Sequence, residues 1–74
     1  MTDTKLLRET IKRSGIKYKF IADSLGISSF GLQKKIDNVH EFKASEIVRI
    51  SSVLNLSDKK RDEIFFAHSV NNIH

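Results

Sequence analysis

Residues 18–36 read YKFIADSLGISSFGLQKKI, and this stretch holds the strongest structural signal in the chain. Apolar residues recur in it at the three- and four-residue spacing of a helix face, in two separate blocks. The pattern predicts two short amphipathic helices in succession. The positions expected to face the core are Phe20, Ile21 and Leu25 in the first helix, and Leu32 and Ile36 in the second.

The connection between these two helices is centred on Gly26. Glycine can adopt the left-handed backbone conformation that ends one helix and turns the chain sharply. Ser28 or Ser29 can then cap the second helix through its hydroxyl group. Ala22 is small enough to let the second helix cross closely over the first. A small residue, a glycine corner and flanking apolar positions in this order are typical of a helix-turn-helix, which presents its second helix to a DNA groove.

The composition favours a small all-α domain. The chain has 74 residues, no Cys, no Pro and three Gly, so disulfides and thiolate metal sites are excluded. Helices with short connections are favoured over turn-rich β-structure. No window approaches the roughly 20 apolar residues that span a bilayer, and residues 1–5 lack the apolar segment of a signal peptide. We expect a soluble protein of the cytoplasm with no membrane partner.

The charge is unevenly distributed along the chain. Residues 1–35 hold eight Lys or Arg and three Asp or Glu, which gives +5, whereas residues 36–74 hold five and six, which gives −1. The positive excess therefore lies on the half that carries the predicted helix-turn-helix. A polyanionic partner is the simplest reason for this asymmetry, and a solvated face that keeps a small protein in solution is the alternative.

Three further helices complete the prediction. One runs from about Asp3 to Arg13 and ends at Ser14-Gly15, one spans about Ala44 to Leu54, and a fifth begins at Ser57 as its cap. Their expected core positions are Leu6, Leu7 and Ile11, then Ile47, Ile50, Val53 and Leu54, then Ile64 and Phe65, with Ala67 or Val70. Residues 1–70 are thus predicted to form a single five-helix domain, followed by a frayed tail over residues 71–74.

Two segments outside the helices also carry predictions. Asn38 can take a left-handed conformation that closes the third helix, and Phe42 in the following connection is expected to turn inward. Phe65 and Phe66 lie about 100° apart on a helix, so one of them should leave the core.

The segments Ile21-Ala22, Leu25–Ser28, Leu32 and the helix from Ser45 resemble the small phage Cro and repressor family of helix-turn-helix proteins, over roughly residues 3–67. Three segments are similar to a subgroup of small temperate-phage regulators: Lys34–Asn38, Glu41–Ile47 and Ile64–Phe66. Within this subgroup the chain resembles an antirepressor. The resemblance implies a compact lambda-repressor-like bundle in the cytoplasm of a bacterial host. It also implies a role in the lysis–lysogeny switch, in which the chain binds the phage main repressor and blocks or modulates its operator binding.

The chain departs from the family pattern at three positions. Tyr18 stands where the family usually has a Gln that bonds a phosphate and steadies a base-reading side chain. Phe30 stands where the family usually carries a polar base-reading residue such as Gln or Asn. Phenylalanine can touch a thymine methyl group, but it cannot hydrogen-bond a base edge. Asn38 replaces the expected Gly, which is a mild change.

Two mechanisms remain open for the surface of the second and third helices. Against DNA, Ser28, Ser29, Phe30 and Lys34 would face bases. Lys17, Lys19 and Lys35 would approach phosphates. Against a protein, Phe30 would be an interface anchor, and the lysines would steer it toward an acidic partner. The candidate residues for binding DNA or a partner are Lys17, Tyr18, Lys19, Ser28, Ser29, Phe30, Gln33, Lys34 and Lys35.

We expect the protein mechanism, with the phage main repressor as partner and residual affinity for DNA. A Cro-like dimer that binds double-stranded operator DNA is the alternative, and a Phe30 folded back against the preceding helix would contradict the anchor role. His40, His68 and His74 share no metal-ligand spacing. No nucleophile, base and acid stand in a recognisable motif, so we expect neither an enzyme nor a cofactor or small-molecule substrate.

Overall fold

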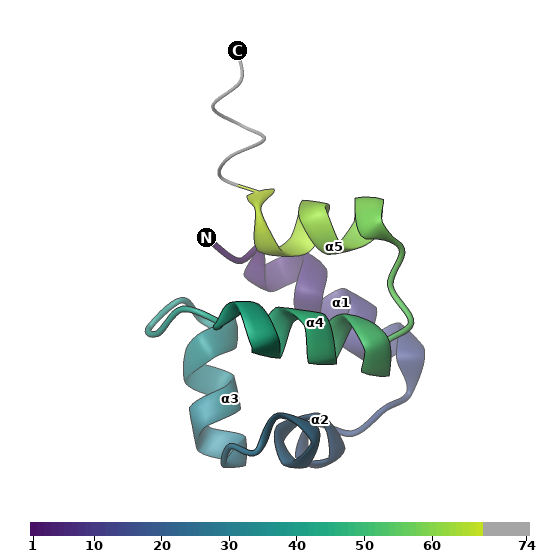
Figure 1. The fold of residues 1–74 in the computed structure, drawn as a ribbon. Helices are drawn as coiled ribbons and strands as arrows, with labels where there is room; N and C mark the ends of the chain where they lie inside the picture. Colours follow the sequence, from purple (N-terminus) through teal and green to yellow (C-terminus); the bar gives the residue numbers. More distant parts are fainter. Residues whose placement is uncertain (68–74) are drawn as a thin grey trace.

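Our computed structural model describes residues 1–67, which fold into five helices joined by short connections (Figure 1). The helices are α1 (Thr4–Ser14), α2 (Tyr18–Leu25), α3 (Ser29–Ile36), α4 (Ala44–Val53) and α5 (Asp58–Phe65). None of these described residues lies in a strand, so the predicted all-α class is confirmed for this part of the chain. Across residues 1–67, every helix is too short or too polar to cross a bilayer. The predicted domain end at residue 70 and the predicted tail lie outside the described range.

The helix ends follow from the capping chemistry of the sequence. The Asp3 carboxylate caps α1 by accepting the N–H of Leu6 at 3.0 Å. Gly15, with φ of 74°, ends the same helix in the left-handed conformation. The hydroxyl oxygen of Ser57 accepts the N–H of Lys60 at 3.1 Å and caps α5. Each cap satisfies a backbone group that the helix itself leaves unpaired.

The corner between α2 and α3 has the predicted geometry. Gly26 has φ of 71°, and the N–H of the next residue, Ile27, donates to the Ala22 carbonyl at 3.1 Å. Of the two candidate caps for α3 it is Ser28 that acts, since its hydroxyl oxygen accepts the N–H of Gly31 at 2.9 Å. Figure 1 shows α3 crossing α2 steeply after this turn.

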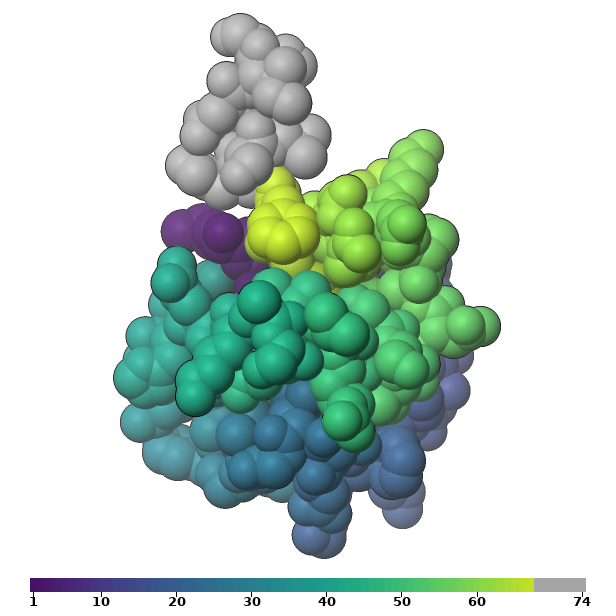
Figure 2. Space-filling view, in the orientation of Figure 1, coloured from purple at the N-terminus to yellow at the C-terminus, as the bar shows by residue number. Residues whose placement is uncertain are grey.

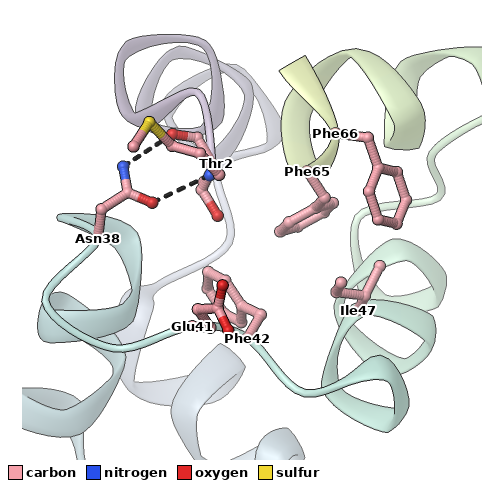
Figure 3. Close-up of a pocket in the computed structure, with 8 residues that line it drawn as sticks. Thr2, Asn38, Glu41, Phe42, Ile47, Phe65 and Phe66 are labelled. Atoms are coloured by element: carbon pink, nitrogen blue, oxygen red, sulfur yellow. Dashed lines mark hydrogen bonds between the residues drawn. The ribbon is translucent and has the colours of Figure 1, made fainter. Parts of the chain in front are cut away.

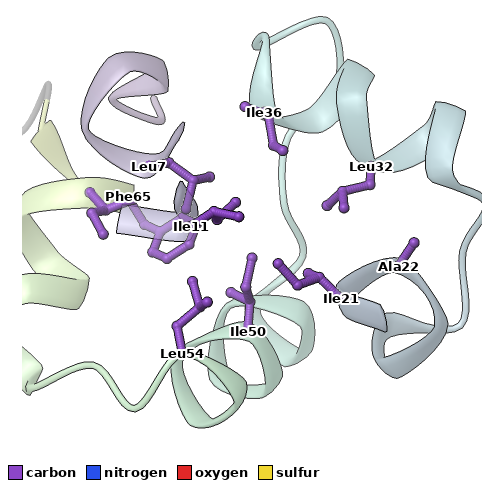
Figure 4. Packing of buried hydrophobic residues seen from close by; sticks show 10 residues of the cluster. Leu7, Ile11, Ile21, Ala22, Leu32, Ile36, Ile50, Leu54 and Phe65 are labelled. Carbon is purple, nitrogen blue, oxygen red and sulfur yellow. The ribbon is translucent and has the colours of Figure 1, made fainter. Parts of the chain in front are cut away.

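All five helices contribute to one apolar core (Figure 4). The space-filling view shows neighbouring helices closing over the centre of the molecule (Figure 2). Each fully buried Leu, Ile or Phe contributes about 1.5–3 kcal/mol relative to exposure. The buried set is Leu7, Ile11, Ile21, Ala22, Leu32, Ile36, Ile50, Leu54, Ile64 and Phe65, and the partly buried side chains packed on it include Leu6, Leu25, Ile47 and Val53.

Phe20 corrects the sequence prediction. It was expected in the core, but 58 % of it is exposed. The inward stripe of α2 instead consists of Tyr18, Ile21, Ala22 and Leu25, which follow the i, i+3, i+4, i+7 pattern of one helix face. Phe20 is one residue before Ile21, and a 100° rotation places it on the outer side of the helix.

Asn38 closes α3 and also fastens the start of the chain. Its φ of 64° confirms the predicted left-handed conformation. Its side-chain oxygen accepts the N–H of Thr2 at 3.0 Å, and its side-chain nitrogen donates to the Thr2 carbonyl at 2.9 Å (Figure 3). Glycine would tolerate the same backbone conformation but could make neither bond. Asn38 therefore both turns the chain and fastens its first residues.

The first residues are joined to α5 as well as to α3. The N–H of Asp3 donates to the Ile64 carbonyl at 2.7 Å. Nearby, Phe42 is half-buried, and its ring meets that of Phe65 edge-on at 5.3 Å between centroids. The inward turn predicted for Phe42 is confirmed. Phe66 is partly exposed while Phe65 is buried, so the prediction that one of the two leaves the core is also confirmed.

Candidate interaction surface on α2 and α3

Phe30 projects from the first turn of α3. The buried side of this helix is occupied by Leu32 and Ile36, both fully inaccessible to solvent. Phe30 falls on the other side and is 68 % exposed, so it does not fold back against α2. The ammonium nitrogen of Lys34, one turn further along α3, lies 4.5 Å from the centre of the Phe30 ring. This distance is that of a cation–π contact.

Lys17 and Lys19 add two exposed cations at the start of α2. Lys17 occupies the N-cap position, and its side chain accepts no cap hydrogen bond. The Lys19 ammonium lies 3.5 Å from the Asp23 carboxylate, but both side chains are largely in solvent. Such an exposed pair contributes only about 0–1 kcal/mol. Lys19 can therefore turn to a binding partner at little cost.

Lys35 departs from the prediction that it approaches phosphates. Its ammonium is 2.6 Å from a carboxylate oxygen of Glu46 in α4, and the two side chains are 13 % and 9 % exposed. The pair joins α3 to α4 and removes Lys35 from the exposed cations. Sequence alone gives no signal for this contact, because the partner lies eleven residues away on another helix.

Glu46 has a perturbed titration. Burial by itself raises the pKa of a carboxyl group, since the charged form loses water. Hydrogen bonds from the Lys35 ammonium and from the Lys43 backbone N–H, at 2.8 Å, outweigh that effect and lower the pKa of Glu46 below its ordinary value. The same carboxylate oxygen accepts both bonds, so Glu46 stays ionised and holds the start of α4 against the end of α3.

Tyr18 contributes to packing and is not an exposed binding residue. It is half-buried, and its hydroxyl oxygen accepts a hydrogen bond from Arg8 of α1 at 3.4 Å. The Arg8 guanidinium also lies 5.9 Å from the ring centre and bonds Asp37 at 2.9 Å. The hydrogen bond to Asp37 raises the pKa of Arg8. This position therefore stabilises the approach of α1 to α2.

The polar residues of α3 offer little for reading bases. The hydroxyl oxygen of Ser28 is already used as the helix cap. Ser29 is exposed, and Gln33 is only half-exposed. A hydroxyl can bond either type of base, so Ser29 would discriminate weakly. The structure thus brings together an aromatic ring and a lysine on the outer side of α3.

Sequence analysis missed the exposure of Phe20, which follows from the inward stripe of α2 described above. The tyrosine at position 18 was the available signal, because it completes the i, i+3, i+4, i+7 set without Phe20.

A second apolar region lies between α4 and α5. A hollow of about 440 Å³ is lined there by Phe42, Ala44, Ile47, Val48, Arg61 and Phe66. A smaller hollow of about 160 Å³ adjoins it and is lined by Met1, Thr2, Asn38, Glu41, Phe42, Ile47, Phe65 and Phe66 (Figure 3). The Arg61 guanidinium beside the larger hollow is already bonded to Asp62 at 2.9 Å. Neither hollow presents converging groups suited to catalysis. Within residues 1–67, no three His, Asp or Glu side chains gather as metal ligands.

Comparisons of the chain with models of known protein families, with curated proteins and with solved structures found no match.

Proposed function

We propose that this protein is an antirepressor of a temperate-phage genetic switch. In this proposal α2 and α3 form the helix-turn-helix of a lambda-repressor-like bundle, and their outer side binds the phage main repressor and blocks or modulates its operator binding. The residues quoted above resemble those of the antirepressor called modulator of repression, which supports the assignment.

The observation that carries the proposal is the exposure of Phe30. A phenylalanine with 68 % of its surface in water leaves most of its apolar area available for contact. Burying an aromatic side chain removes about 150–250 Å² from water, and aromatic residues dominate the energetics of protein interfaces. Lys34 lies beside the ring and is half-exposed, and Lys17 and Lys19 are exposed at the start of α2. These cations would speed association with an acidic partner.

The same surface is poorly suited to reading an operator sequence. A good bidentate contact contributes about 1–3 kcal/mol of discrimination, and it requires Arg, Lys, Asn or Gln side chains aimed at base edges. Phe30 cannot hydrogen-bond a base, Lys35 is paired with Glu46, and Ser28 is engaged as a cap. The remaining lysines support weak affinity for phosphates, so residual binding to DNA belongs to the proposal.

A mobility-shift assay with phage operator DNA tests the proposal, with the main repressor present or absent. We expect this protein alone to retard the DNA weakly and without sequence preference at physiological salt. We expect it to remove or alter the band formed by the repressor. Tight and specific retardation by this protein alone would instead establish a Cro-like dimeric repressor, which should also show the steep salt dependence of phosphate binding.

A matched pair of variants locates the binding surface. Phe30→Ser and Val48→Ser each remove an apolar side chain, and the two are almost equally exposed at 68 % and 69 %. Because Val48 lies on α4, only Phe30→Ser should weaken repressor binding, by about 2 kcal/mol or more for an anchor residue. Equal effects of the two substitutions would contradict the assignment to α2 and α3.

A further inference from the structure

Phe30 and Lys34 act as one unit on α3. They are four residues apart, and the ammonium nitrogen already lies 4.5 Å from the ring centre in the free protein. The contact holds the lysine beside the ring before any partner arrives, which reduces the ordering cost on binding. A partner that covers the ring must therefore also accommodate a positive charge next to it.

Within residues 1–67, the Lys34 ammonium forms no ion pair with a carboxylate. Asp23 lies beside Lys19, and Asp37 at the end of α3 is bonded to Arg8. Glu46, the nearest carboxylate of α4 to this helix, is taken up by Lys35. Covering Lys34 with an apolar surface would bury an unpaired ammonium, and a buried unpaired charge is strongly unfavourable.

We propose that the matching site on the partner is an apolar recess with a carboxylate on its rim. The recess receives the Phe30 ring, and the carboxylate pairs with the Lys34 ammonium. This inference rests on the proposed function, because it describes the repressor surface that the antirepressor binds. DNA fits the pair less well, since a phosphate would satisfy the lysine but a groove offers the ring at most a thymine methyl group.

The test is a charge exchange measured by titration calorimetry with the purified phage main repressor. Lys34→Glu should weaken binding at least about tenfold, because a like charge then faces the carboxylate. Lys5→Glu is the matched control, since Lys5 is exposed on α1 and the charge change is identical. It should change the affinity less than about threefold. Each exposed Asp and Glu of the repressor is then replaced by Lys in turn, and one replacement should restore binding to Lys34→Glu.

The outcomes separate this inference from the proposed function. Absence of binding by the unaltered protein overturns both. Binding that is insensitive to Lys34→Glu, or that no single repressor replacement restores, overturns the carboxylate-rimmed recess and leaves the antirepressor function standing. A third outcome is that Lys34→Glu loses the retardation of DNA while its repressor binding is unchanged. That result identifies a phosphate as the partner of the Lys34 charge and also overturns the carboxylate-rimmed recess. Circular dichroism checks that each variant is folded. If Lys34→Glu is unfolded, Lys34→Gln is used in its place, and its affinity for the repressor should fall at least about threefold.

Discussion

Glu46 and Lys35 form the one ion pair among the described residues in which both side chains are nearly buried. Lys35→Met would leave the Glu46 carboxylate buried with only the Lys43 N–H as donor. We expect a loss of about 2 kcal/mol in the free energy of unfolding, measured by urea denaturation. Lys19→Met is the control, because it breaks the exposed pair with Asp23 and should cost less than about 0.5 kcal/mol. An equal loss in the free energy of unfolding for the two variants would show that burial of the Lys35–Glu46 pair adds no stability.

The same carboxylate makes stability depend on pH. The folded protein lowers the pKa of Glu46 below its ordinary value of 4.5, so its stabilising contribution is complete above that pH. The contribution is lost as the pH falls through the folded pKa, since the unfolded chain then binds the proton more readily. Urea midpoints between about pH 6 and pH 2 should fall more steeply in the unaltered protein than in Lys35→Met. The same dependence of the urea midpoint on pH in both proteins would contradict this contribution of Glu46.

Asn38 combines a backbone role with a side-chain role, and substitution separates the two. Asn38→Gly keeps the left-handed conformation but removes both bonds to Thr2, so we expect it to cost about 1–2 kcal/mol. Asn38→Ala loses the same bonds and also strains the backbone, and thermal unfolding should show a further loss of about 1 kcal/mol. If Asn38→Gly leaves the stability unchanged, the two hydrogen bonds to Thr2 contribute nothing measurable to it.

Among the elements, the corner between α2 and α3 depends on the backbone of Gly26. Apart from its two chain neighbours, no described atom lies within 4 Å of the place a Cβ would occupy there, so a substitution is opposed chiefly by the φ of 71°. Gly26→Ala should therefore lower the free energy of unfolding by about 1–2 kcal/mol in a urea titration. Gly26→Asn is the control and should lose less, because asparagine already adopts this conformation at Asn38 and Asn55.

Local chemistry made the helix boundaries predictable from sequence. Gly26 and Ser57 act through their own backbone or side chain on neighbouring groups, so no distant contact is needed to identify them. The orientation of α2 was harder, since Tyr18 and Phe20 could both be assigned to the apolar face. Packing against the other helices selects Tyr18, whose hydroxyl can also reach Arg8 of α1. The Lys35–Glu46 pair could not be predicted, because it depends on how α3 and α4 meet.

For the molecule as a whole, core and interaction surface are expected to be separable. Leu32 is fully buried, and Leu32→Ala should cost about 2–5 kcal/mol, enough to lower the melting temperature markedly in so small a protein. Phe30→Ala, two residues earlier on the same helix, should change the melting temperature little while weakening repressor binding. A large thermal loss in Phe30→Ala would mean that its ring supports the fold despite its exposure.

The contact between the first and last described helices also determines when the protein can act after its synthesis starts. Asp3 bonds Ile64, and Phe65 enters the core beside residues of α1, so the core stays open until both ends of the domain are present. A nascent chain that still holds α5 inside the ribosome cannot complete this closure. Competence to bind should thus arise abruptly, once residue 65 has emerged, and not build up gradually during translation.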